Sequence, residues 1–98
     1  MSALDLGNNY AHVSGAATTV VSDRPRGILK GIAVNTPIAN ATVTVRDGDA
    51  TGPIIGAITL PADVSAMPPS TLLQNIEYAT SLTVVTTGVG LDVTVIWR

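Results

Sequence analysis

Short runs of β-branched residues, separated by glycine and proline, fill this chain from about residue 26 to residue 98. Valine, isoleucine and threonine suit the pleated, half-buried surface of a β-strand, whereas glycine and proline favour turns. The runs recur at the spacing of roughly 8–12 residues that is typical of all-β sandwiches and barrels. The sequence therefore predicts an all-β fold, a small antiparallel β-sandwich of jelly-roll-like form.

Residues 41–46 show the clearest strand pattern, because apolar Ala41, Val43 and Val45 alternate with polar residues. Side chains on a strand point to opposite faces in turn, so these three residues should face the core. The same reasoning predicts further strands at residues 27–34, 54–60, 82–87 and 91–97. Gly-Val-Gly at residues 88–90 predicts a hairpin between the last two.

The period of two also assigns a face to each remaining strand. In each of three strands, four alternate residues should share one face of that strand. They are Ile28, Lys30, Ile32 and Val34 in residues 27–34, Ile54, Gly56, Ile58 and Leu60 in residues 54–60, and Leu91, Val93, Val95 and Trp97 in residues 91–97. Residues 72–78 fit either a strand or a short helical turn. Residues 61–70 contain three prolines and should form a crossing loop.

Charge is scarce in this chain. Only 12% of the residues are charged, against about 25% in typical soluble domains. A small monomer needs surface charge to stay dispersed, so other subunits are expected to cover part of this surface. The alternative is a soluble monomer whose exterior is rich in threonine and serine.

Several partner classes are not expected. The net charge is −2 and the five basic residues form no stripe in the sequence, which argues against nucleic acid. No apolar run approaches the roughly 20 residues of a membrane span. The first residues have neither a basic region nor a continuous apolar region of the kind that begins a secretory signal. The protein is therefore expected to be made in the cytoplasm.

Residues 1–25 show no sustained period and are predicted to form an extended N-terminal arm ahead of a β-sandwich body at 26–98. Within the arm, residues 16–22 fit one short strand that ends before Pro25. The apolar side chains of the arm have no periodic face on which to bury within their own subunit, so they are predicted to contact another chain. They are Leu4, Leu6, Tyr10, Val13, Val20 and Val21.

No catalytic constellation is evident, and the chain is not expected to be an enzyme or to hold a cofactor. A serine hydrolase site would have to use His12, the only histidine, which lies in the poorly patterned arm. The absence of cysteine excludes disulfides and thiolate chemistry.

The turn at residues 47–52 contains the only close pair of aspartates, Asp47 and Asp49. Calcium takes about six to eight oxygen ligands, and this turn offers some of them. Glycine and aspartate are also the residues that a hairpin turn selects for backbone reasons, and this structural interpretation is preferred.

Trp97 has two interpretations. On the inward face of the last strand it is a core residue, which we prefer. Beside an outward Ile96, it would instead fill a subunit interface, where tryptophan is enriched.

Four segments carry a resemblance to a known group of proteins. They are Gly31-Ile-Ala-Val-Asn, Ala41-Thr-Val-Thr-Val-Arg-Asp-Gly-Asp, Gly56-Ala-Ile-Thr-Leu-Pro, and Ser81-Leu-Thr-Val-Val-Thr-Thr-Gly with Asp92-Val-Thr-Val-Ile-Trp. Together they resemble small all-β bacteriophage virion proteins over residues 27–98. Ser81 stands where that group commonly has glycine, and Trp97 where it commonly has tyrosine.

The resemblance implies a structural role, as a decoration or cement protein bound to the major capsid protein on the outside of a phage capsid. It also implies a homotrimer. Two alternatives remain open: a tail, fibre or head-completion component, and a small β-sandwich that binds a ligand in its loops.

Overall fold

The computed structural model describes residues 9–23, 25–63, 71–73 and 75–98. These residues form β-strands joined by turns and contain no helix. The strands are β1 (Asn9–Ser14), β2 (Ala17–Ser22), β3 (Gly27–Thr36), β4 (Thr42–Asp47), β5 (Ile54–Thr59), β6 (Thr71–Leu72), β7 (Ile76–Tyr78), β8 (Leu82–Thr86) and β9 (Asp92–Trp97).

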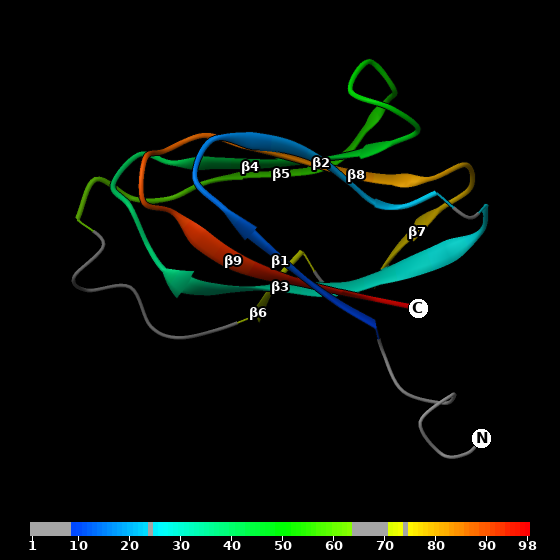
Figure 1. The fold of residues 1–98 in the computed structure, drawn as a ribbon, viewed down its shortest axis with the longest axis horizontal. Helices are drawn as coiled ribbons and strands as arrows, with labels where there is room; N and C mark the ends of the chain where they lie inside the picture. Colours follow the sequence, from blue (N-terminus) through cyan, green and yellow to red (C-terminus); the bar gives the residue numbers. More distant parts are fainter. Residues whose placement is uncertain (1–8, 24, 64–70, 74) are drawn as a thin grey trace.

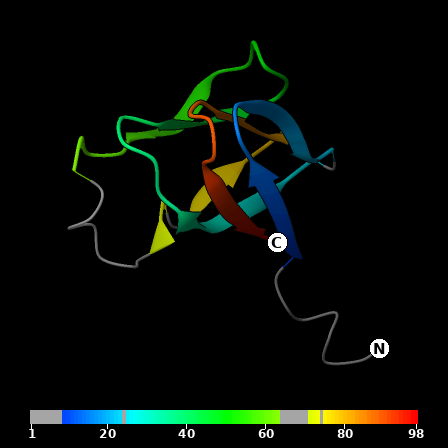
Figure 2. The same ribbon diagram turned by 60° about the vertical axis from the view of Figure 1, so that its left-hand side comes forward.

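The strands make two antiparallel sheets that pack face to face (Figures 1 and 2). Sheet A has the order β1-β9-β3-β6, with β7 also paired to β3. Sheet B has the order β2-β8-β4-β5. The expected all-β sandwich is therefore confirmed.

The strand pairs are nested around the β4–β5 loop. Strand β4 pairs with β5, β3 with β6 and β7, β2 with β8, and β1 with β9. Strand β9 pairs in addition with β3, and β8 with β4, which completes the two sheets. The two ends of the described chain therefore meet within one sheet.

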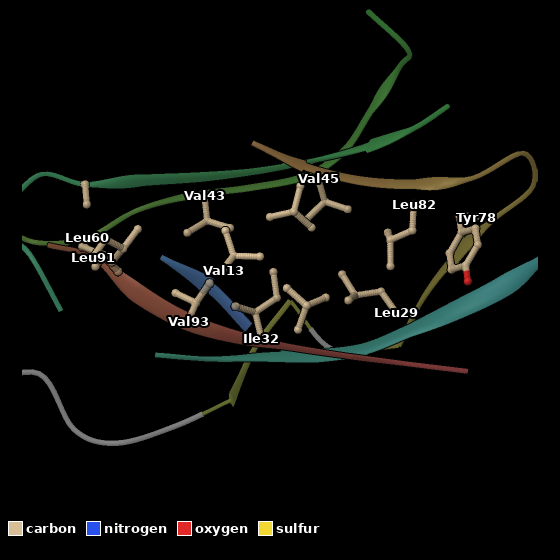
Figure 3. Packing of buried hydrophobic residues seen from close by; sticks show 13 residues of the cluster. Val13, Leu29, Ile32, Val43, Val45, Leu60, Tyr78, Leu82, Leu91 and Val93 are labelled. Atoms are coloured by element: carbon tan, nitrogen blue, oxygen red, sulfur yellow. The ribbon is translucent and has the colours of Figure 1, made fainter. Parts of the chain in front are cut away.

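The core lies between the sheets and is almost entirely aliphatic (Figure 3). Both sheets contribute to it. Its buried apolar residues are Val13, Leu29, Ile32, Ala41, Val43, Val45, Leu60, Tyr78, Leu82, Val84, Leu91, Val93 and Val95. The inward faces predicted for 41–46 and for Leu91, Val93 and Val95 are confirmed. Trp97 is partly buried and packs against this cluster, as the preferred interpretation expects.

The predicted hairpin at residues 88–90 is wrong. Strand β8 belongs to sheet B and β9 to sheet A, so this turn crosses from one sheet to the other. Gly88 and Gly90 adopt positive φ angles of 115° and 88°. Glycine adopts such angles freely, both in a hairpin between paired strands and in a connection between two sheets. The Gly-Val-Gly pattern therefore does not distinguish a hairpin from a crossing.

The faces predicted for residues 27–34 are also wrong in part. The register between β3 and β9 shifts between Leu29 and Gly31. A bulge of this kind reverses the alternation, so Leu29 and Ile32 are both fully buried while Ile28 and Lys30 are not. In β5 a second shift, opposite Arg46, leaves Ile54 55% exposed although Leu60 is buried.

The predicted arm is wrong for residues 9–22. Strand β1 pairs with β9 along its whole length, and β2 pairs with β8. Each is an edge strand. The outward positions of these strands include apolar Tyr10 and Val20, so the sequence shows no strong alternation of polar and apolar residues. The short strand expected at 16–22 is confirmed as β2.

Two further segments were predicted from the sequence. Residues 72–78 contain strand β7 rather than a helical turn, and Leu73 and Asn75, which precede it, have positive φ angles. The greater part of the predicted crossing loop, residues 64–70, lies outside the described residues.

Candidate functional site

The residues predicted to form an interface do not share one surface. Val13 is 3% exposed and belongs to the core, and Val21 packs against the core. Tyr10 is 66% exposed on β1 of sheet A, whereas Val20 is 56% exposed on β2 of sheet B. Leu4 and Leu6 lie outside the described residues.

The outer face of sheet B is built from threonine and small apolar side chains. One row across the sheet, from β2 to β5, is Thr18, Val85, Thr44 and Ala57. The neighbouring row is Val20, Thr83, Arg46 and Ile54, of which Thr83 is fully buried. Arg46 is the only charged residue in these two rows, and its guanidinium donates to the Gly52 carbonyl at 2.7 Å. This face is therefore nearly free of unpaired charge.

The outer face of sheet A carries the single histidine. Nε2 of His12 on β1 contacts the carboxylate of Asp92 on β9, and the contact is an ion pair when the imidazole is protonated. The imidazole is 63% exposed, and its position on an open sheet face leaves it in contact with water. Because the pair joins the edge strand β1 to β9, it contributes to holding that edge in place.

The carboxylates of Asp47 and Asp49 accept hydrogen bonds from turn residues and thereby stabilise those turns. The Asp47 carboxylate accepts the backbone N–H groups of Ala79 at 2.9 Å and Thr80 at 2.8 Å. The Asp49 carboxylate accepts the backbone N–H and the hydroxyl of Thr51, at 2.8 and 2.7 Å. These donors lower the pKa of both carboxyl groups, because each stabilises the charged form. The local geometry thus matches the turn interpretation.

The described residues contain no group of three or more histidine, cysteine, aspartate or glutamate side chains placed to hold a metal ion. In the same residues there is no helix long and apolar enough to cross a membrane.

A pocket of about 530 Å³ opens at the end of the sandwich where β3 begins and β9 ends. Two arginines and two carboxylates line it, together with Gly27, Ile28, Tyr78 and Ala79; the charged residues are Arg26, Arg98, Asp47 and Glu77. Arg26 has a φ of 62°, and its N–H donates to the Ala79 carbonyl at 3.0 Å. No described residue pairs with the guanidinium of Arg26 or Arg98. We call this region, with Arg46 and Asp47, the charged end.

Val89 is a surface residue that sequence reasoning missed. It lies in the β8–β9 turn between two glycines and is 90% exposed. The available signal was an aliphatic residue at a turn, where glycine, asparagine, aspartate and serine are usual.

Comparisons with known proteins identify no relative. No protein-family model matches the chain, and neither the curated proteins nor the solved structures contain a significant match.

Proposed function

We propose that this protein is a structural component of a bacteriophage virion, a decoration or cement protein. In this role it is made in the host cytoplasm, binds the major capsid protein on the capsid exterior as a homotrimer, and stabilises the head. It performs no enzymatic step, holds no cofactor, and binds neither nucleic acid nor membrane.

The outer face of sheet B carries this proposal. Its two central rows contain a single charged residue, already hydrogen-bonded within its own loop, while Val20 and Ile54 are more than half exposed. A surface with so little charge to desolvate suits burial against another protein. The fold is also appropriate, because the nested strand pairs support a jelly-roll form, and jelly rolls recur in viral capsid proteins.

Co-sedimentation with capsids assembled from the major capsid protein tests the proposal. The exposed Thr18 lies on the outer face of sheet B, so Thr18→Lys should weaken capsid binding at least tenfold without lowering the melting temperature. Ser14→Lys, at an exposed position on β1 of sheet A, is the matched control and should bind as the wild type does. Capsids that bind neither the wild type nor the variants would refute the proposal.

A tail, fibre or head-completion role would use the same fold. Mass spectrometry of purified heads and tails separates these roles, since a decoration protein must be found with the heads in many copies. Recovery with tails alone would replace the decoration role by this alternative.

A ligand-binding sandwich is the second candidate, and the pocket at the charged end favours it. Two guanidinium groups without a partner among the described residues would hold an anionic ligand by charge-assisted hydrogen bonds. Carboxylates, phosphate and acidic sugars should then raise the melting temperature, and Arg26→Ala should abolish that shift. An unchanged melt with all three ligand classes would remove this candidate.

A further inference from the structure

The pocket at the charged end brings charges of both signs together. Its lining contains the guanidinium groups of Arg26 and Arg98 and the carboxylates of Asp47 and Glu77. No ion pair joins any two of these four described residues. Opposite charges that share a cavity without pairing leave both signs available to a ligand. The volume of about 530 Å³ is that of a small-molecule site.

The strand register determines how Glu77 and Arg98 are placed. Glu77 of β7 lies opposite Ile28 of β3, and Arg98 exchanges two backbone hydrogen bonds of 2.9 Å with Ile28. Residues directly opposite one another on antiparallel strands share a face of the sheet, so Glu77 and Arg98 lie on either side of the partly exposed Ile28. Their Cα atoms are two strand spacings apart, which is about 10 Å. An apolar side chain therefore separates the two opposite charges.

Tyr78 contributes a buried hydroxyl to the pocket. The residue is only 5% exposed, and its ring lies at the end of the core with the hydroxyl pointing toward β3 (Figure 3). A Cβ on Gly27 would collide with this hydroxyl, so the glycine leaves the space that the tyrosine fills. The hydroxyl makes no hydrogen bond to a described residue. Because a buried hydroxyl without a hydrogen bond is unfavourable, a polar ligand atom would supply the partner that it lacks.

The two carboxylates of the pocket differ in their availability. The Asp47 carboxylate already accepts the backbone N–H groups of Ala79 and Thr80, whereas no described residue donates to Glu77. The backbone of Arg26 is held at the pocket rim, since its N–H donates to the Ala79 carbonyl at 3.0 Å. The pocket thus offers a ligand two guanidinium groups and one tyrosine hydroxyl as donors, and one carboxylate as an acceptor.

We propose that this pocket binds a zwitterion of the amino acid or short peptide class, whose carboxylate and ammonium groups are separated by an apolar chain. The ligand carboxylate lies between the guanidinium groups of Arg26 and Arg98 and accepts a hydrogen bond from the Tyr78 hydroxyl. The ammonium group pairs with Glu77, and the apolar chain lies on Ile28.

Mixed charge distinguishes this ligand class from simple anions. The two arginines and the two carboxylates cancel, so the lining carries no formal net charge. A ligand with negative charge alone would meet the carboxylates of Asp47 and Glu77 as well as the guanidinium groups, whereas a zwitterion pairs each of its own charges. This inference rests on the ligand-binding candidate described above and specifies its ligand. It goes beyond the decoration role, which does not use the pocket.

An NMR titration of the isotope-labelled full chain tests the proposal. The probes are 6-aminohexanoate, hexanoate and hexylamine, which share one chain length and differ only in their charged groups. The zwitterion should bind about tenfold more tightly than either other probe, because each of those lacks one charge pair. The amide signals that shift should belong to residues 26–28, 77–79 and 98, which line the pocket.

Four variants assign the charges of the ligand to residues. Glu77→Gln should abolish the preference for 6-aminohexanoate over hexanoate and leave the affinity for hexanoate unchanged. Arg98→Gln should weaken both of these probes, and so should Tyr78→Phe, which keeps the ring and removes only the hydroxyl. Lys30→Gln, which removes a positive charge outside the pocket lining, is the control and should bind all three probes as the wild type does. Thermal melts verify that each variant is folded.

Three outcomes would overturn the proposal. Equal affinities for hexanoate and 6-aminohexanoate would exclude the zwitterion and leave the anionic ligand of the second candidate standing. Absence of binding by all three probes in the millimolar range would also exclude it. A preference for the zwitterion that survives Glu77→Gln would place the ammonium group elsewhere. None of these measurements involves capsids, so a failure of the virion role would remain distinguishable.

Discussion

The carboxylate of Asp47 accepts the backbone N–H of Ala79 at 2.9 Å, across 32 positions of sequence. This contact joins the end of β4 to the turn between β7 and β8, and therefore sheet B to a connection from sheet A. A residue that the sequence presents as part of a local turn thus holds together two loops that are distant along the chain.

We expect this contact to make stability depend on acid pH. The N–H donors hold the pKa of Asp47 below its ordinary value of 3.8. A carboxyl group whose pKa is lower in the folded state contributes stability above the unfolded value, and loses it as pH falls through the folded value. The melting temperature of the wild type should therefore decrease when the pH is lowered below about 4.

Asp47→Asn should melt at a lower temperature than the wild type at pH 7 and lose less on acidification. Thermal melts followed by circular dichroism between about pH 7 and pH 3 provide the measurement. Glu77→Gln, an exposed charge removal outside these hydrogen bonds, is the control and should retain the acid response of the wild type. An Asn variant with an undiminished acid response would show that other groups cause it.

A second prediction concerns the first two strands. Deletion of residues 1–22 should abolish the cooperative melt, because it removes an edge strand from each sheet and Val13 from the core. Deletion of residues 1–8 is the matched control, since it leaves every described strand intact. If the longer deletion melts as sharply as the shorter one, β1 and β2 are dispensable to the sandwich.

Core packing gives a third prediction. Ile32 is fully buried at the centre of sheet A, so Ile32→Ala should lower the free energy of unfolding by about 2–5 kcal/mol. Ile54→Ala, at a position 55% exposed, should cost well under about 1 kcal/mol. Urea denaturation measures both changes, and equal costs would contradict the packing described for the two residues.

Metal dependence is the fourth prediction. Because the Asp47 and Asp49 carboxylates already accept backbone hydrogen bonds, calcium or EDTA should leave the melting temperature unchanged. A rise with calcium that Asp49→Asn removes would instead establish a calcium site in the turn.

The sequence predicted the strands better than their connections. Residues 41–46 alternate regularly, and their inward face follows directly from the period of two. The Gly-Val-Gly turn is equally clear as a turn, yet nothing local reports that β8 and β9 pair with β2 and β3 rather than with each other. Strand pairing depends on strands that are distant in the sequence, and a local pattern contains no information about them.

The candidate surfaces were even harder to predict from the sequence than the connections. Val13 and Val20 look alike in the sequence, but one faces the core of the sandwich and the other faces solvent. The bulge at Leu29 and Gly31 leaves no compositional mark beyond a glycine, although it reverses the faces of β3. The surface around Val89 appears only when segments more than 70 positions apart in the chain, such as those of Gly15 and Leu91, are brought together.

The nested pairing of β1 with β9 and β2 with β8 bears on how the chain reaches this structure. Sheet B lacks the strand between β2 and β4 until β8 is available, and sheet A lacks the strand between β1 and β3 until β9 is available. Contacts between residues so distant in sequence require the closure of long loops before they bring any stabilisation, and they slow folding. During synthesis the apolar side chains of the early strands therefore stay unburied until β9 has left the ribosome.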